Sequence, residues 1–220
     1  MRGDKLLIEA RHRQTAETLA DRLIAKLERH TAPLVVTIAG ESGCGKSETA
    51  VALSEALGRR GVSTLVLQQD DYFHFPPKTN AAKRREDLAW VGPGEVRLDL
   101  LDRHAQQLRE GATSIVKPLV LYEEDRIVEE KIDVGDARVV VVEGTYTSLL
   151  DHADLRIFIE RTAEQARRAR TERGREALDE WLERVLRIEH GIIVEHKDRA
   201  NYVITPDDAV LEHAPETVES

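Results

Sequence analysis

The sequence predicts an α/β fold in which helices cover both faces of a five-stranded, mainly parallel sheet, a three-layer αβα sandwich. Short apolar runs rich in β-branched residues recur along the 220 residues, as in strands buried on both faces. Stretches with helical spacing separate these runs, and that alternation is typical of a parallel sheet. The composition, 41% hydrophobic and 33% charged with 4% aromatic residues, is that of a globular protein. The length favours a single domain over residues 1–220.

The first part of the chain alternates between helix and strand. Apolar residues three and four apart predict a helix over about residues 10–30, within an N-terminal helical extension of residues 1–32. A strand over residues 34–39 follows Pro33. A helix over residues 47–57, with Gly58 as its C-terminal cap, leads to a second strand over residues 64–67.

The remaining strands are separated by longer segments. Between the second and third strands lies a segment of about residues 72–137, with a helix near residues 99–110 and a hairpin near residues 115–134. Three further apolar runs predict strands over residues 138–142, 155–159 and 202–204. The acidic tail after Ala209 is expected to fray.

Charge and cysteine content exclude several classes of protein. The formal net charge of −9 disfavours binding to nucleic acid or to anionic membranes, because both need a basic surface. The single cysteine, Cys44, cannot form an intramolecular disulfide, and no apolar run reaches 18 residues. The N-terminal residues lack a signal-peptide core. We therefore expect a cytoplasmic protein without nucleic-acid or membrane partners, and the oligomeric state, including a homo-oligomer, stays open.

Residues 40–47 read Gly-Glu-Ser-Gly-Cys-Gly-Lys-Ser and fit the phosphate-binding pattern Gly-x-x-x-x-Gly-Lys-Ser between a predicted strand and a predicted helix. In such a loop, backbone N–H groups and the positive helix end surround phosphate oxygens. The lysine reaches the β- and γ-phosphates, and the serine hydroxyl binds Mg²⁺. The pattern predicts ATP and Mg²⁺ as ligands, the alternative being a connecting turn. The expected nucleotide-binding residues are Gly40, Ser42, Gly43, Cys44, Gly45, Lys46, Ser47 and Glu48.

Carboxylates follow two of the predicted strands, at the edge where parallel sheets bind ligands. Glu143 comes directly after residues 138–142, and Asp70 and Asp71 follow residues 64–67. Asp70 can take the proton of an attacking hydroxyl. Ser47, Glu143 and Asp70 are the expected metal ligands. The alternatives are a helix-start acid for Glu143 and ordinary turn aspartates for the pair.

The order of these motifs resembles the uridine kinase and phosphoribulokinase family over about residues 34–206. The matching elements are the loop at residues 40–47, Gln69-Asp70-Asp71-Tyr72-Phe73, Val142-Glu143-Gly144-Thr145 and an arginine-rich segment after the fourth strand. The resemblance implies the P-loop kinase fold, an ATP-dependent kinase for a small acceptor, and Asp70 as the catalytic base. It also implies that the insertion at residues 72–137 binds the acceptor.

The arginine-rich segment holds six arginines within fifteen residues. The resemblance implies that about residues 161–177 form a helical lid over the nucleotide. Arg167 and Arg170 would share one helix face and act as catalytic residues on the phosphates. The alternative is a solvated helix with weak pairs to neighbouring glutamates.

The resemblance is weakest where the family binds its acceptor. Residues 90–97 lack the aspartates and the histidine of the family motif, and no histidine follows Tyr122. Uridine is therefore disfavoured, because unpaired polar groups reject a ligand strongly. Convergence of Arg84, Arg97 and Arg126 would indicate an anionic acceptor. The candidate acceptor residues are Asp71, Tyr72, His74, Arg84, Trp90, Arg97, Tyr122 and Arg126.

Two classes of function remain after these steps. The leading one is an ATP-dependent phosphotransferase whose acceptor is a hydroxyl of a nucleoside, sugar, sugar phosphate or hydroxy acid. The other is a nucleotide-dependent switch or ATPase that acts on a protein partner through the helix at residues 10–30. Release of ADP that requires a small acceptor distinguishes the first from the second.

Overall fold

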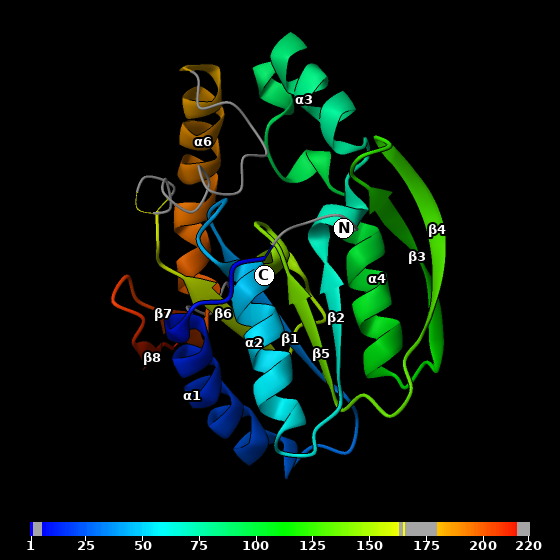
Figure 1. Ribbon diagram of the computed structural model, residues 1–220, viewed down its shortest axis with the longest axis vertical. Coiled ribbons are helices and arrows are strands. Elements are labelled where there is room, and N and C mark those ends of the chain that lie inside the picture. Colours follow the sequence, from blue (N-terminus) through cyan, green and yellow to red (C-terminus); the bar gives the residue numbers. More distant parts are fainter. Residues whose placement is uncertain (2–5, 163–164, 166–179, 215–220) are drawn as a thin grey trace.

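A computed structural model describes residues 1, 6–162, 165 and 180–214, and shows a central sheet covered by helices (Figure 1). The main sheet has the strand order β2-β5-β1-β6-β7-β8. Its strands are β1 (Leu34–Gly40), β2 (Thr64–Gln68), β5 (Val139–Glu143), β6 (Leu155–Ile159), β7 (Tyr202–Ile204) and β8 (Val210–Glu212). The first five pair in parallel, which confirms the predicted five-stranded parallel sheet.

The sixth strand corrects the sequence prediction. Instead of fraying directly after Ala209, the chain turns at Asp208, whose φ is +68°, and β8 pairs antiparallel with β7. A hydrogen bond of 3.0 Å from Arg22 Nη2 to the Val210 carbonyl holds this edge strand against the N-terminal helix. A strand of three residues is too short to show a strand pattern in the sequence, and Arg22, which contacts it from α1, lies far away along the chain.

Helices cover the two faces of the sheet because alternate strand residues point to opposite sides. The helices α1 (Ala10–Leu27) and α2 (Lys46–Gly58) pack together on one face, over Val36 and Ile38 of β1. On the other face, α4 (Leu98–Arg109) packs over Val35. Gly58 ends α2 as its last residue, so the predicted cap lies one residue too early. No helix within the described ranges is long and apolar enough to cross a membrane.

Two helices lie beyond the carboxyl ends of the strands, where a ligand would enter. Figure 1 shows α3 (Pro77–Glu86) and the upper part of α6 (Glu180–Ile193) on opposite sides of the space above the sheet. The C-terminal end of α6 is fixed to the sheet, because Ile193 is fully buried against Ala39 and Phe158. The two helices therefore form walls on either side of the sheet edge that holds the predicted site.

A separate hairpin flanks α4. It consists of β3 (Ser114–Leu121) and β4 (Arg126–Asp133), which pair antiparallel and confirm the predicted hairpin. A buried ion pair of 2.8 Å between Lys117 Nζ and Asp71 fixes the hairpin to the segment after β2. The backbone N–H of Val120 donates to the same carboxylate at 2.9 Å. The Asp71 carboxylate thus joins the hairpin to the segment after β2 through a buried ion pair and a backbone hydrogen bond.

Replacing Lys117 by methionine is expected to destabilise the protein by about 3 kcal/mol, because the Asp71 carboxylate would stay buried without its main counter-charge. Urea unfolding measures the loss, and the double variant with Asp71→Asn should recover part of it. A loss below about 0.5 kcal/mol in the single variant would show that the pair does not hold the hairpin.

The burial of one histidine, His196, leads us to expect that the stability of the protein changes with pH. His196 lies in η5 (Val194–Arg199), with Nδ1 2.8 Å from Ser148 Oγ. Burial, and then the charge of Arg199, lowers the pKa of His196 to about 4 from 6.5. As the pH falls from 7 to 5, the unfolded chain binds a proton that the folded chain does not. The free energy of unfolding should therefore fall, by on the order of 1 to 2 kcal/mol.

Urea titrations of the wild type and of His196→Asn at pH 7 and pH 5 isolate this contribution. The variant should lose less stability than the wild type between the two pH values. Equal losses would show that His196 is not the responsible group.

Candidate active site

The loop between β1 and α2 has the strand–loop–helix context that the sequence predicted. Gly45 caps α2 with a φ of +104°, a left-handed conformation that costs glycine little. A Cβ atom at this position would also lie 3.0 Å from Nε2 of His12 in α1. The loop therefore needs glycine at position 45 for backbone conformation and for space.

The loop lysine points back into the loop. Lys46 Nζ donates to the Glu41 carbonyl at 2.8 Å, and Lys46 is only 9% exposed. The Glu41 carboxylate in turn lies 2.7 Å from Nδ1 of His190 on α6. The first contact holds the Lys46 ammonium group within the loop, where the lysine of a phosphate-binding loop can reach the bound phosphates. The second contact connects the loop to the wall formed by α6.

The three predicted metal ligands lie together beside this loop. Ser47 Oγ donates to Glu143 Oε1 at 2.9 Å, and Gln68 Nε2 reaches the same oxygen at 3.3 Å. Burial, and then the nearby charge of Asp70, raises the pKa of Glu143 above its ordinary value, although Lys46 and Ser47 act in the opposite direction. A bound cation would stabilise the charge of a carboxylate such as Glu143, which is buried next to a second carboxylate.

The oxygen donors at this place suit Mg²⁺. Within the described ranges, no three His, Cys, Asp or Glu side chains form a cluster that would hold a metal alone. Mg²⁺ in phosphoryl-transfer enzymes is commonly held by one or two carboxylates together with substrate phosphates and water. Glu143, Asp70 and the Ser47 hydroxyl meet that requirement.

Asp70 and Asp71 are neighbours in η1 (Gln69–Tyr72) but have different surroundings. Asp70 lines a pocket next to the loop. Asp71 is 2% exposed, and its carboxylate binds Lys117 and the Val120 N–H of the hairpin. The Asp71 oxygens, which were predicted to face an acceptor, are thus bound to the hairpin, and Asp71 does not line the pocket.

The pocket has a volume of about 250 Å³ and lies between the loop, α3 and α6. Ser42, Gly43 and Thr145 form its loop side, together with Asp70. Its apolar lining includes Met1, Phe73, Phe75, Pro77, Ala81, Leu182, Val185 and Leu186. Its polar lining includes Lys78, Asn80, Arg84, Tyr122 and Glu189. Asn80 and the α6 residues were missed because no local motif marks them.

Of the predicted acceptor residues, Arg84 and Tyr122 line this pocket. The Tyr72 side chain is fully buried, with its hydroxyl 2.8 Å from Nδ1 of His104 in α4. Trp90 donates through Nε1 to Asn80 Oδ1 at 2.9 Å, behind the lining. The Arg126 side chain is 60% exposed and pairs with Glu124 on the hairpin. None of these three side chains lines the pocket.

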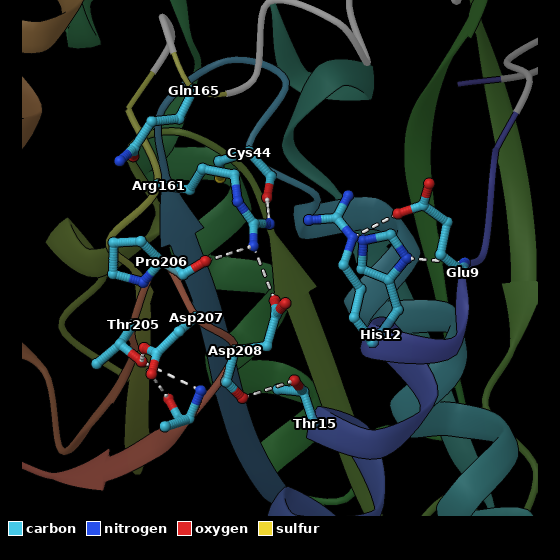
Figure 2. A network of polar contacts seen from close by, with 12 residues as sticks. Glu9, His12, Thr15, Cys44, Arg161, Gln165, Thr205, Pro206, Asp207 and Asp208 are labelled. Atoms are coloured by element: carbon cyan, nitrogen blue, oxygen red, sulfur yellow. Dashed lines mark hydrogen bonds and ion pairs between the residues drawn. The ribbon is translucent and has the colours of Figure 1, made fainter.

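A second polar network connects the loop to the turn between β7 and β8 (Figure 2). Arg161 Nη2 lies 2.8 Å from Asp208 and 3.2 Å from the Pro206 carbonyl, and Nη1 lies 3.3 Å from the Cys44 carbonyl. Thr15 of α1 donates to the Asp208 carbonyl at 3.2 Å. Arg161 thus joins the phosphate-binding loop to the turn between β7 and β8.

Three further predictions concern residues near this network. Arg167 and Arg170 lie outside the described residues. The Cys44 side chain is buried, and burial raises the pKa of its thiol, so it acts as a small core residue. The Glu48 side chain is 3% exposed and accepts from the Leu7 N–H at 3.5 Å, so it faces the segment before α1 instead of the loop interior.

Comparison with known proteins gives consistent matches. The model of the Phosphoribulokinase / Uridine kinase family matches residues 35–205. The chain is 27% identical over 188 residues to the uridine kinase of Lactiplantibacillus plantarum, covering 80% of this chain and 88% of that protein. It is 26% identical over 193 residues to the bifunctional alpha-galactosidase/sucrose kinase AgaSK of Mediterraneibacter gnavus, covering 81% of this chain and 21% of that protein. The chain thus spans about a fifth of that larger relative.

The fold is also found among solved structures. Phosphoribulokinase from Rhodobacter spheroides superposes with a TM-score of 0.63 at 13% identity, covering 86% of this chain and 83% of that one. At this identity the similarity concerns the fold, an α/β sandwich of the P-loop kinase type.

Proposed function

Because the chain belongs to the phosphoribulokinase / uridine kinase family, we propose that it is an ATP-dependent kinase that phosphorylates a hydroxyl of a small metabolite. The observation that carries this proposal is the position of Asp70. This carboxylate lines the pocket and lies beside Glu143, which accepts a hydrogen bond from Ser47 of the loop. A proton acceptor, a cation site and a phosphate-binding loop thus meet at one end of the pocket.

The loop would bind the nucleotide phosphates. Its backbone N–H groups and the N-terminus of α2 favour anionic oxygens, and Lys46 supplies a full positive charge. Ser47, Glu143 and Asp70 would hold Mg²⁺, which neutralises charge on the β- and γ-phosphate oxygens when it is bound. Occupation of the loop by phosphate would give the Lys46 ammonium a stronger partner than the Glu41 carbonyl.

Asp70 would position the acceptor hydroxyl and receive its proton. The hydroxyl oxygen forms a bond to the γ-phosphorus, the bond between that phosphorus and the β–γ bridging oxygen breaks, and ADP leaves. Water in the same position would accept the phosphoryl group, and ATP would be hydrolysed without product. Closure of the pocket around the acceptor is therefore part of the function. The apolar side chains on α3 and α6 would exclude that water.

A coupled ADP-release assay with nucleosides, polyols, sugars, sugar phosphates and hydroxy acids tests the proposal. Steady ADP release should require one of these acceptors, and that acceptor should raise the melting temperature by mass action. ADP release that no acceptor increases would contradict it. The alternative switch function needs a free surface on α1, but the apolar side of α1 is buried against α2 through Leu19, Ala20 and Leu23.

A further inference from the structure

We propose that Asp125, in the turn of the β3–β4 hairpin, is a positioning residue for the acceptor pocket: it caps the N-terminus of α3 and thereby holds the α3 wall of the pocket. This inference rests on the proposed kinase function, which places the acceptor in this pocket. The observation that points to it is a set of three hydrogen bonds that one carboxylate accepts from the first turn of α3. Figure 1 shows the hairpin turn at the same end of the molecule as α3.

The first turn of α3 has no cap of its own. The first N–H groups of a helix lack a partner within the helix, and a side chain just before the helix commonly accepts from them. In α3 that position is Pro76, whose side chain cannot accept a hydrogen bond, and the first helical residue, Pro77, has no N–H. The N–H groups of Lys78 and Thr79 therefore need an acceptor from elsewhere in the chain.

Asp125 supplies this acceptor. Its Oδ1 accepts from the Lys78 N–H at 2.6 Å, and its Oδ2 accepts from the Thr79 N–H at 3.2 Å and from the Thr79 hydroxyl at 2.8 Å. The helix dipole also favours negative charge at this end of α3. A second contact between the same two segments runs from Lys78 Nζ to the Glu123 carbonyl at 3.2 Å. The turn of the hairpin thus binds the start of α3.

The backbone of the turn restricts which residue can provide this cap. Asp125 has a φ of +47°, in the left-handed region that glycine, asparagine and aspartate adopt more readily than other residues. Its N–H donates to the Tyr122 carbonyl at 3.3 Å, which closes the turn. Position 125 therefore needs both a particular backbone conformation and a side-chain acceptor, and aspartate and asparagine provide both.

The position of α3 depends on polar contacts because the helix contributes little to the apolar core. Among the ten residues of α3, all of which the structure describes, Asn80 alone is buried. Asn80 and Arg84 both donate to the Glu95 carboxylate and so hold the middle of the helix. Asp125 holds the first turn, where no buried apolar side chain of α3 would replace its hydrogen bonds.

The start of α3 belongs to the pocket. Four of its first five residues line the pocket, namely Pro77, Lys78, Asn80 and Ala81. Asp125 is not among the lining residues, so its effect on an acceptor passes through α3. If the first turn loosens in the free protein, acceptor binding must order it again, and that cost lowers the affinity for the acceptor. The phosphates of ATP, which the loop of residues 40–47 would bind, do not depend on this turn.

Hydrogen exchange of the ligand-free full chain, followed by mass spectrometry, tests the cap itself. Asp125→Gly keeps the positive φ accessible and removes the acceptor oxygens, whereas Asp125→Asn keeps the conformation and an acceptor oxygen. We expect exchange in peptides from residues 77–86 to be about five- to tenfold faster than in the wild type for Asp125→Gly, as loss of a helix cap would give, and within threefold for Asp125→Asn. Exchange at the wild-type rate in Asp125→Gly would overturn the inference.

Steady-state kinetics test the consequence for the acceptor. The probes are uridine, ribitol, D-fructose, D-fructose 6-phosphate and D-glycerate with saturating Mg·ATP, and KM is compared for each compound that the wild type phosphorylates. We expect Asp125→Gly to raise the KM for the acceptor by about five- to tenfold, while kcat and the KM for ATP stay within twofold. Asp125→Asn should return the acceptor KM to within threefold of the wild type. Glu124→Gly, which adds a glycine and removes an exposed carboxylate in the same turn, is the matched control and should behave like the wild type.

An unchanged acceptor KM in Asp125→Gly, in an assay in which the wild type is active, would overturn the inference and leave the kinase function intact. Equal increases of KM for the acceptor and for ATP, or equal increases in the glycine and asparagine variants, would also overturn it, because they would indicate a general effect of the turn. Transfer to none of the compounds by the wild type would overturn the proposed function and with it the role of Asp125 at the acceptor.

A variant on the α3 side of the cap covers the case in which thermal melting shows that Asp125→Gly does not fold. Thr79→Val removes the hydrogen bond from the Thr79 hydroxyl to Asp125, and Thr79 does not line the pocket. This variant is expected to raise the acceptor KM by about threefold. An unchanged acceptor KM in Thr79→Val would then overturn the inference.

Discussion

Replacing Asp70 by asparagine is expected to lower kcat by about 10² to 10⁴ while Mg·ATP still protects the protein from thermal unfolding. The amide has the size of the carboxylate but cannot take the proton of the acceptor hydroxyl. Because Asp70 is half-buried at the pocket and does not join the hairpin contacts of Asp71, the melting temperature without ligand should change little. Single-turnover phosphorylation of the acceptor found in the screen measures the loss.

Asp71→Asn is the matched control, because it makes the same chemical change one residue away. Asp71 holds Lys117 and the hairpin, so this variant should lose stability and keep kcat within a few-fold of the wild type once folded. Turnover of Asp70→Asn within twofold of the wild type would contradict the assignment of the base.

Replacing Lys46 by alanine is expected to weaken Mg·ATP binding by about 100-fold and to abolish turnover, since the loop would lose its only full positive charge among residues 40–47. The rise in melting temperature on adding Mg·ATP should disappear at concentrations that saturate the wild type. Lys26→Ala at the exposed end of α1 is the control and should bind like the wild type. An unchanged nucleotide affinity in Lys46→Ala would mean that the phosphates bind elsewhere.

The parallel sheet and the phosphate-binding loop could be predicted because their determinants are local. Each buried strand is a short apolar run, as in Val139–Glu143, and the loop is a contiguous pattern with fixed positions. The edge that holds Asp70 and Glu143 follows from the strands alone, since parallel strands end at the same side. That is why Ser47, Asp70 and Glu143 lie together as expected.

The pocket beside Asp70 could not be predicted in the same way. Asp70 and Asp71 are chemically identical, and only the turn of η1 directs one to the pocket and the other to Lys117. The Arg84 guanidinium pairs with Glu95 and with Glu189, and Glu189 is 105 residues away from Arg84 in the sequence. The sequence could not show whether Arg84, Arg97 and Arg126 converge, and of these three only Arg84 lines the pocket.

A crystal structure of the protein with Mg²⁺ and a non-hydrolysable ATP analogue tests the assignment of this site most directly. We expect the triphosphate within the loop of residues 40–47, with Lys46 on the terminal phosphates, Ser47 and Glu143 at the cation, and the γ-phosphate facing Asp70 across the pocket. A triphosphate bound away from this loop, or one whose γ-phosphate points away from Asp70, would contradict it.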